Sequence, residues 1–160
     1  MIIQNDIRTG TNPLILSNGS VIYEYSHIVA GANIGKNCKL GQGTYMAAKA
    51  KVGDRTRVGN YVSIWDGVTI GKDCFIAPYV VFTNDHDPRD TKAPYPDKTK
   101  VGNNVMICAN STIIAPCNIG DSAFIGARSL ILRDIRKKEK VFGTVKREWT
   151  ADEWVMWDVS

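Results

Sequence analysis

The sequence predicts an all-β fold, a parallel β-solenoid, from three observations about one six-residue repeat. A bulky apolar residue recurs at every sixth position from residue 28 to 82 and again from 101 to 131. The residue after this core position is usually glycine or alanine, and the residue four places after it is small or compact. A period of six fits neither a helix nor a hairpin strand, but it fits short parallel strands that each turn one large side chain inward. The core positions are Ile28, Ile34, Leu40, Met46, Val52, Val58, Ile64, Ile70, Ile76, Phe82, Val101, Ile107, Ile113, Ile119, Ile125 and Ile131.

Three repeats would close one triangular coil, so the sequence predicts roughly five or six coils. At about 4.8 Å per coil, the strand spacing of a sheet, the prism would be about 25 Å tall. A glycine or alanine beside each core position permits a tight corner and a close approach of successive coils.

The chain enters this solenoid near residue 16, because Leu16 and Ile22 are in phase with Ile28. We therefore predict a lead-in over residues 1–15, which lies over the open top, and a solenoid over residues 16–147. The first coil carries Tyr23, Glu24, Tyr25 and His27. Tyr23, Tyr25 and His27 form either an outward aromatic rim that stabilises the coil or part of a ligand-binding wall.

One regular coil contains an exception at Trp65-Asp66, where a small residue is expected after the core position. A tryptophan does not fit a tight interior corner, so its side chain should point outward. It either packs against a neighbouring subunit or lines a site.

The repeat is interrupted once, by a polar and proline-containing segment between Phe82 and Val101. We expect this loop, residues 83–100, to project from a corner and to carry function, because insertions in regular repeats commonly do so. The alternative is a loop that only extends into solvent. Its reactive side chains are Asn84, Asp85, His86, Asp87 and Arg89, and His86 is one of two histidines in the chain.

Basic residues follow the last repeat, where they either form a solvated face or bind the phosphates of a long ligand. Residues 148–160 begin with a capping-box pattern at Thr150 and contain Trp154 and Trp157, which predicts a short helix over the last coil. The basic residues concerned are Arg133, Arg136, Lys137, Lys138, Lys140, Lys146 and Arg147.

The composition suits one domain of 160 residues with 44% hydrophobic residues and a sizeable core. A net charge of +4 is too small to indicate nucleic-acid binding. The first residues lack a signal-peptide pattern and no stretch is long and apolar enough to span a membrane. All four cysteines lie at small positions of the repeat, which favours reduced, packed thiols and a cytoplasmic location.

Three stretches give the chain a family resemblance: residues 60–70, the Phe82-Thr83-Asn84 corner with Pro88-Arg89, and residues 107–131. They resemble the hexapeptide-repeat, left-handed β-helix acyltransferases, most closely the N-acetyltransferases that act on nucleotide-linked amino sugars in lipopolysaccharide and surface-glycan biosynthesis. The resemblance covers residues 16–145 and implies the left-handed coil. Three features depart from the family. Glu24 stands where a histidine is expected, and Asp85-His86-Asp87 is closer to the loops of sugar O-acetyltransferases. The usual Gly-Asn-Pro-Ala-Lys near the end of the repeats is reduced to Val-Phe-Gly-Thr-Val-Lys at residues 141–146.

The resemblance implies a homotrimer, with each active site shared by two subunits. It also implies that acetyl-CoA binds in a slot between neighbouring prisms, and that the acceptor is a nucleotide-linked sugar such as a UDP- or dTDP-sugar. We assign substrate binding to Tyr23, Glu24, His27, Trp65, Asp66, Asp87 and Arg89, and binding of acetyl-CoA to Ala109, Ala115, Ala127, Arg128, Arg133, Lys137, Lys138, Lys140 and Lys146.

Acetyl transfer from a thioester needs a neutral nucleophile, a proton acceptor and donors for the developing oxyanion. His86 is the best general base, because its reference pKa near 6.5 suits neutral pH. Asp85 or Asp87 would orient the His86 ring or hold the ammonium of the sugar. Asn84 would orient the acceptor or donate to a carbonyl oxygen.

Two alternatives remain open. One is an O-acetyltransferase that acts on a sugar hydroxyl, and the other is a solenoid that is non-catalytic or metal-dependent. Hexapeptide-type carbonic anhydrases hold zinc with three histidines, whereas this chain has only His27 and His86. We therefore expect no metal.

Overall fold

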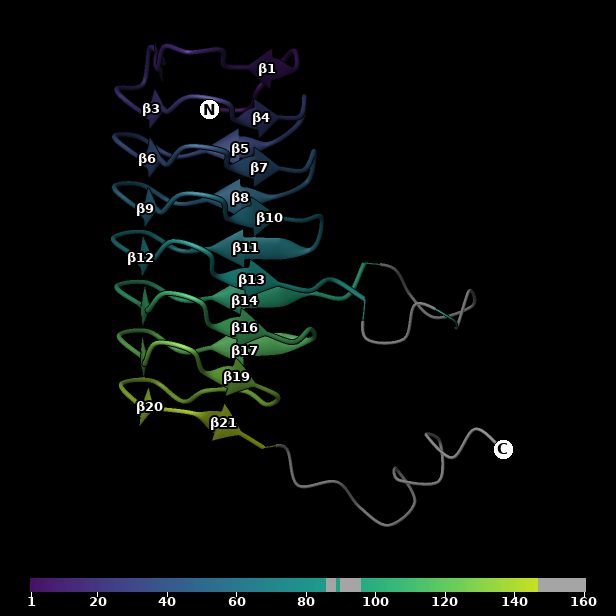
Figure 1. Ribbon diagram of the computed structural model, residues 1–160, viewed down its shortest axis with the longest axis vertical. Coiled ribbons are helices and arrows are strands. Elements are labelled where there is room, and N and C mark those ends of the chain that lie inside the picture. Colours follow the sequence, from purple (N-terminus) through teal and green to yellow (C-terminus); the bar gives the residue numbers. More distant parts are fainter. Residues whose placement is uncertain (86–88, 90–95, 147–160) are drawn as a thin grey trace.

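The computed structural model of the chain describes residues 1–85, 89 and 96–146. Within these ranges every regular element is a β-strand, and the strands stack into a left-handed parallel β-helix (Figure 1). The predicted fold class is confirmed. The predicted helix over residues 148–160 lies outside the described residues.

The coils form the three faces of a prism, which we name sheets A, B and C. Sheet B has eight strands: β1 (Ile7–Arg8), β4 (His27–Ile28), β7 (Tyr45–Met46), β10 (Ser63–Ile64), β13 (Val81–Phe82), β16 (Thr112–Ile113), β19 (Leu130–Ile131) and β21 (Thr144–Val145). Sheet A has five: β5 (Asn33–Ile34), β8 (Lys51–Val52), β11 (Val68–Ile70), β14 (Thr99–Val101) and β17 (Cys117–Ile119). Sheet C has eight: β2 (Leu14–Ile15), β3 (Val21–Ile22), β6 (Lys39–Leu40), β9 (Arg57–Val58), β12 (Phe75–Ile76), β15 (Met106–Ile107), β18 (Phe124–Ile125) and β20 (Lys140–Val141).

The core positions predicted from the repeat are the buried interior of the prism. From β3 onward, each two-residue strand turns its first side chain outward and its second inward, as in β4, where His27 is half-buried and Ile28 is fully buried. Stacked strands keep equivalent residues in register, so that Val52 pairs with Ile70 and Ile70 pairs with Val101. The apolar column that results excludes water along the whole axis, which is the main source of stability in such a narrow fold.

The three corners between the sheets differ in backbone conformation. At the AC corner (from sheet A to sheet C) and the CB corner, the third residue after the core position has a positive φ, as at Arg55 and Tyr61. At the BA corner, only Gly31 and Gly67 have a positive φ among the described residues. The BA corner is therefore the one whose backbone varies from coil to coil.

Both ends of the solenoid depart from the regular coil. In the lead-in, β1 and β2 pair antiparallel with β4 and β3, and the ammonium of Met1 donates to the carbonyl of Ile34 at 2.6 Å. These contacts cover part of the upper strand edges. At the lower end the coil contracts: core residues that pair across neighbouring coils are 18 residues apart at Ile34 and Val52 but 16 apart at Ile119 and Ile135.

Candidate functional site

The single insertion in the described solenoid leaves it at the BA corner, after β13 (Figure 1). At stacked AC corners, the amide of one residue donates to a side-chain oxygen 18 residues later, as from Lys36 to Asp54. The same hydrogen bond joins residues 31 apart at Lys72 and Asn103, because the loop intervenes. The loop is anchored where it starts and ends. Thr83 Oγ1 accepts a hydrogen bond from the amide of Ala115 (2.8 Å), and the amide of Asp97 donates to the carbonyl of Asn84 (2.8 Å).

These anchors fix Asn84 and Asp85, two of the three predicted catalytic residues, at the start of the loop. Both are half-buried there. The third, His86, lies outside the described residues, as does Asp87, and Arg89 is exposed. The sequence places His86 two positions after Asn84.

Trp65 and Asp66 occupy the same BA corner one coil above. Asn84 Nδ2 donates to the carbonyl oxygen of Asp66 at 3.4 Å, and Asp66 Oδ1 accepts from the amide of Lys49 at 2.8 Å. The structure therefore brings together Trp65, Asp66, Asn84 and Asp85, which the sequence analysis had assigned separately. Trp65 remains 38% exposed at this edge.

An aromatic column extends from Trp65 toward the N-terminal end of the prism. The ring of Trp65 lies 5.0 Å from that of Tyr45, and Tyr45 lies 5.5 Å from His27 in an edge-on arrangement. His27 Nε2 contacts Asp6 Oδ2 at 3.2 Å, and Asp6 Oδ1 accepts from the amide of Ala30. That amide, followed by the His27 contact, lowers the pKa of Asp6. The sequence analysis missed Tyr45, although its outward position one coil below His27 could have indicated it.

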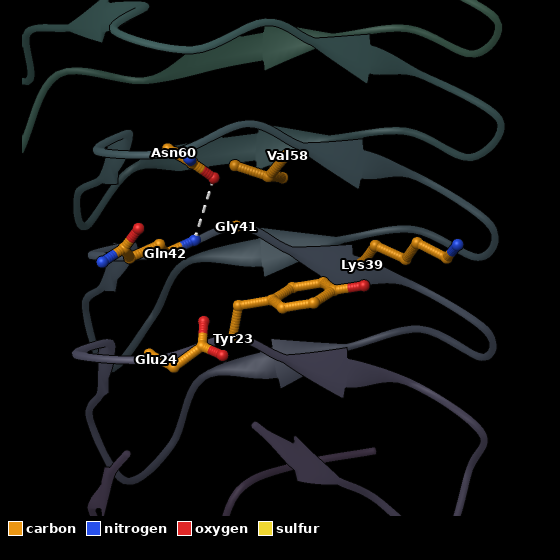
Figure 2. Close-up of a pocket in the computed structure, with 7 residues that line it drawn as sticks. All are labelled: Tyr23, Glu24, Lys39, Gly41, Gln42, Val58 and Asn60. Atoms are coloured by element: carbon orange, nitrogen blue, oxygen red, sulfur yellow. Dashed lines mark hydrogen bonds between the residues drawn. The ribbon is translucent and has the colours of Figure 1, made fainter. Parts of the chain in front are cut away.

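Tyr23 and Glu24 lie at a different corner. They line an open pocket at the CB corner with Lys39, Gln42 and Asn60, about 280 Å³ in volume (Figure 2). The amide of Gln42 donates to Asn60 Oδ1 at 3.1 Å, which joins two coils behind this pocket. Within one chain the structure does not bring Tyr23 and Glu24 to the BA corner.

The residues assigned to acetyl-CoA are spread over the lower coils. Ala109, Ala127 and Arg128 lie at the CB corner, Lys137 and Lys138 at the AC corner, Ala115 and Arg133 at the BA corner, Lys140 in β20 and Lys146 after β21.

Arg133 is engaged within the last coil. Its Nη2 atom lies 2.8 Å from Glu139 Oε1, and Glu139 Oε2 accepts from the amide of Arg136 at 2.8 Å. The Arg133 guanidinium is the main reason that the pKa of Glu139 falls to about 2. A phosphate at Arg133 would have to compete with this ion pair.

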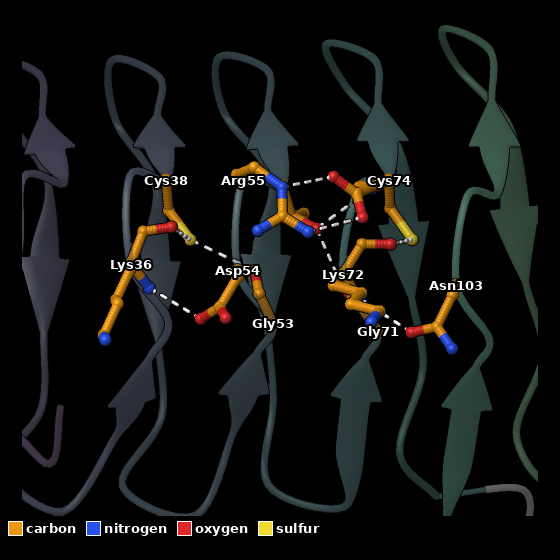
Figure 3. Close-up of polar contacts among 11 residues, drawn as sticks. Lys36, Cys38, Gly53, Asp54, Arg55, Gly71, Lys72, Cys74 and Asn103 are labelled. Atoms are coloured by element: carbon orange, nitrogen blue, oxygen red, sulfur yellow. Dashed lines mark hydrogen bonds and ion pairs between the residues drawn. The ribbon is translucent and has the colours of Figure 1, made fainter.

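The cysteine thiols are packed between coils rather than grouped. Cys38, Cys74 and Cys117 are free and buried, and burial raises the pKa of each, that of Cys117 to about 12. The thiol of Cys38 donates to the carbonyl of Gly53 at 3.1 Å (Figure 3). Such thiols are poor nucleophiles.

Over residues 1–85, 89 and 96–146, no three His, Cys, Asp or Glu side chains come together in a way that could hold a metal ion. Over the same residues, no helix has the length and apolar character needed to cross a membrane.

The repeats match a known family model, that of the bacterial transferase hexapeptide (six repeats), over residues 49–84 and 98–133. Among curated proteins, the bifunctional protein GlmU of Stutzerimonas stutzeri is 29% identical over 168 residues, covering 96% of this chain and 37% of that protein. GlmU of Streptococcus uberis is 31% identical over 133 residues, covering 80% of this chain and 26% of that protein. The chain thus spans about a third of the length of these relatives.

Solved structures share the fold at low sequence identity. A variant of AntD, an N-acyltransferase from Bacillus cereus in complex with dTDP and coenzyme A, has a TM-score of 0.64 at 18% identity, over 90% of this chain and 83% of that one. A variant of GDP-perosamine N-acetyl transferase from Caulobacter crescentus, in complex with CoA and GDP-perosamine, has a TM-score of 0.66 at 15% identity, over 78% of this chain and 53% of that one. The chain thus carries the repeats of the bacterial transferase hexapeptide model over these two segments, and the solved structures share its fold.

Proposed function

We propose that this protein is an acetyl-CoA-dependent N-acetyltransferase that acts on the amino group of a nucleotide-linked sugar, such as a UDP- or dTDP-sugar. The observation that carries the proposal is the placement of the one insertion. It leaves the solenoid at the BA corner and starts with Asn84 and Asp85, next to Asp66 and Trp65. A regular solenoid with reactive side chains gathered at one insertion is typical of a functional loop.

The proteins that share this fold support the chemistry. The AntD structure is described with dTDP and coenzyme A, and the perosamine enzyme with CoA and GDP-perosamine. A hexapeptide-repeat acetyltransferase from Vibrio cholerae, similar over 69% of this chain with a TM-score of 0.62 at 22% identity, is complexed with acetyl coenzyme A. A thioester donor and a nucleotide-linked acceptor are the substrates to test first.

The reaction assigns a role to each residue at the start of the loop. The acceptor nitrogen forms a bond to the thioester carbonyl carbon, the carbon–sulfur bond breaks, and the thiolate takes the proton that the amine loses. His86 would carry that proton, and Asn84 would donate to the carbonyl oxygen as negative charge develops on it. Asp85 would hold the acceptor ammonium or orient His86. Because a neutral amine is already a good nucleophile, positioning supplies much of the rate.

The donor would lie along the lower coils, below the loop. Ala127 is exposed and Ala109 is half-buried, and their short side chains leave room for a long, narrow ligand beside the backbone. Ala115 is a weaker candidate, because it is buried and its amide already donates to Thr83 Oγ1. Arg128, Lys138 and Lys140 are exposed cations at this end that can meet phosphates. Arg133 is a weaker candidate, because Glu139 already holds its guanidinium.

We also propose an assembly and a cellular location for this enzyme. We propose a homotrimer in which the CB corner of one subunit, with Tyr23 and Glu24, contributes to the site of its neighbour. The four free cysteines fit a reducing compartment, and we propose the cytoplasm.

Calorimetry with coenzyme A and with dTDP and UDP tests binding, and release of thiol from acetyl-CoA with dTDP-linked amino sugars tests transfer. We expect both nucleotide and coenzyme to bind and the amine to be acetylated. Acetylation of the matched sugar that carries a hydroxyl instead of the amine would indicate O-acetyltransfer. Absence of heat with coenzyme A would contradict the assignment as an acyltransferase.

A further inference from the structure

Three aromatic side chains lie above the loop, along sheet B and the BA corner, and the chemistry proposed for Asn84 does not use them. Trp65 lies one coil above Asn84, Tyr45 one coil above Trp65, and His27 one coil above Tyr45. At about 4.8 Å per coil, the column extends roughly 10–14 Å from the loop toward the N-terminal end. The described residues at the place of Trp65 in other coils are smaller or aliphatic: Val29, Ala47, Thr83, Ile114 and Leu132.

The packing of the solenoid does not require Trp65. The core position before it, Ile64, is fully buried and fills the interior, whereas the Trp65 side chain lies outside, 38% exposed and supported by Tyr45. An aromatic ring held rigidly at the surface offers a stacking face at little cost in side-chain entropy.

Two exposed cations flank the column. Lys49 follows Tyr45 at the BA corner, and its amide is bound to Asp66, which fixes the base of the side chain beside Trp65. Arg8 pairs with His27 across β1 and β4. No ion pair or side-chain hydrogen bond of Lys49 or Arg8 is present among residues 1–85, 89 and 96–146. Both cations remain available for an anionic ligand.

We propose that Trp65, Tyr45 and Lys49 form a subsite for the nucleoside diphosphate part of the acceptor, an inference that rests on the proposed function. The sugar lies against Trp65 with its amine at Asn84, the diphosphate meets Lys49, and the base stacks toward Tyr45 and His27. The order of chemical groups in the acceptor then matches the order of side chains along the edge. Trp65 and Lys49 act as specificity residues that align the amine with the thioester.

The test is calorimetric titration of the full chain with dTDP, UDP and GDP, and separately with coenzyme A. Loss of a stacking partner commonly weakens binding of a base by about five- to a hundredfold, so Tyr45→Ala should raise the Kd of the nucleotide by that factor, and Tyr45→Phe by less. Because Trp65 faces the sugar, Trp65→Ala should weaken binding of a dTDP-linked amino sugar more than binding of dTDP itself. Lys49→Ala should raise it about tenfold and flatten its dependence on salt. Lys72→Ala, an equally exposed lysine at the AC corner, should change nothing.

The coenzyme titration separates two kinds of failure. If coenzyme A binds all variants alike but the nucleotides bind without regard to Tyr45 and Lys49, the subsite is wrong and the acyltransferase assignment stands. If coenzyme A and the nucleotides both fail to bind the unaltered protein, the proposed function fails and the subsite with it. Circular dichroism of each variant confirms that the prism is intact, and the exposed Lys49→Ala variant keeps the test valid if Tyr45→Ala does not fold.

Discussion

The side chain of Asn84 is held against the coil above it. Asn84 Nδ2 donates to the backbone carbonyl of Asp66, and the backbone carbonyl of Asn84 accepts from the amide of Asp97. These two hydrogen bonds fix Asn84 at the start of the loop. Asn84→Ala should lower kcat without moving the pH profile, because an amide does not titrate between pH 5 and 9. Asn103→Ala, which removes an amide of similar role at the AC corner, is the control.

His86→Ala should behave differently in the same assay. If the acceptor is an amine, kcat should fall about ten- to a hundredfold and the acidic limb of the pH profile should disappear. If the acceptor is a hydroxyl, its much higher pKa makes the base more necessary, and the loss should reach about a thousandfold or more. Full activity in both the Asn84 and His86 variants would show that the loop is not the active site.

Glu139 gives the last coil a stability that depends on pH. Arg133 and the amide of Arg136 lower its pKa in the folded protein to about 2, below the value of about 4.3 expected when unfolded. A carboxyl with a lowered folded pKa stabilises the fold above its unfolded pKa, and the contribution is lost as pH falls from about 4.3 toward 2. Glu139→Gln should therefore be less stable than the unaltered protein at pH 7, and the difference should shrink in this acidic window.

Urea unfolding followed by circular dichroism at several pH values measures this difference. Asp73→Asn, which breaks the exposed pair between Asp73 and Arg55, should change the stability at pH 7 far less, because solvent screens an exposed ion pair. A difference for Glu139→Gln that stays constant from pH 7 to pH 2 would contradict the role given to the carboxylate.

Among the elements, successive coils are joined by buried hydroxyls as well as by strand pairing. Thr56 Oγ1 donates to the carbonyl of Gly71 at 2.7 Å and accepts from the amide of Cys74 at 3.0 Å. Thr99, the first residue of β14, also lies two places before a core residue and is buried, yet its hydroxyl has no hydrogen-bond partner in the described structure. The two threonines can therefore be compared by mutation, because one hydroxyl is hydrogen-bonded and the other is not.

Thr56→Val should destabilise the protein by about 1–3 kcal/mol, because it leaves a buried carbonyl and a buried amide without their partner. Thr99→Val has nearly the same shape and removes a hydroxyl that is already unpaired, so it should be neutral or stabilising. Midpoints of thermal and urea unfolding compare the two directly. Equal losses in both variants would mean that the hydroxyl bonds between coils are not the source of the difference.

The elements that the sequence predicted best are those set by burial. Residues such as Ile28 and Ile113 repeat because only a large apolar side chain fills the prism, and this signal survives in the sequence alone. The corners were less predictable. Tyr61 and Arg55 occupy positive-φ positions that usually favour glycine or asparagine, so their residue types gave no sign of the conformation. The strands β1 and β2 have no repeat because they pair antiparallel at an end.

For the whole molecule, the site depends on which corner each residue reaches. The repeat shows that Trp65 directly follows a core position and that the insertion follows the core position Phe82. Counting three repeats per coil could therefore have placed both at the same corner of the prism. Tyr45 was missed because an outward aromatic in a strand resembles many surface residues until its contacts with Trp65 and His27 are known. The wide spread of the residues assigned to acetyl-CoA, from Ala109 to Lys138, follows from assigning them by sequence position rather than by corner.

The outer faces of the prism differ in polarity, and this difference indicates how the chain assembles. The outward residues of sheet A are polar, as at Lys51 and Lys100. The CB corner and the sheets beside it expose apolar groups: Tyr61 and Tyr79 stack at 5.4 Å and are each about half exposed, and Met106 is 41% exposed. Exposed aromatic and methionine side chains are enriched at the centres of protein interfaces.

We predict a homotrimer that buries the CB corner, because cyclic symmetry lets one such surface be covered in every subunit. Tyr79→Glu places a charge in that interface and should dissociate the trimer, since burying an unpaired carboxylate costs several kcal/mol. Lys100→Glu, on the polar face of sheet A, changes the charge in the same direction and should leave the assembly intact. Light scattering during size exclusion at micromolar concentration measures the mass. A monomer for the unaltered chain would contradict the trimer and any site shared between subunits, while leaving the aromatic column within each chain to be tested on its own.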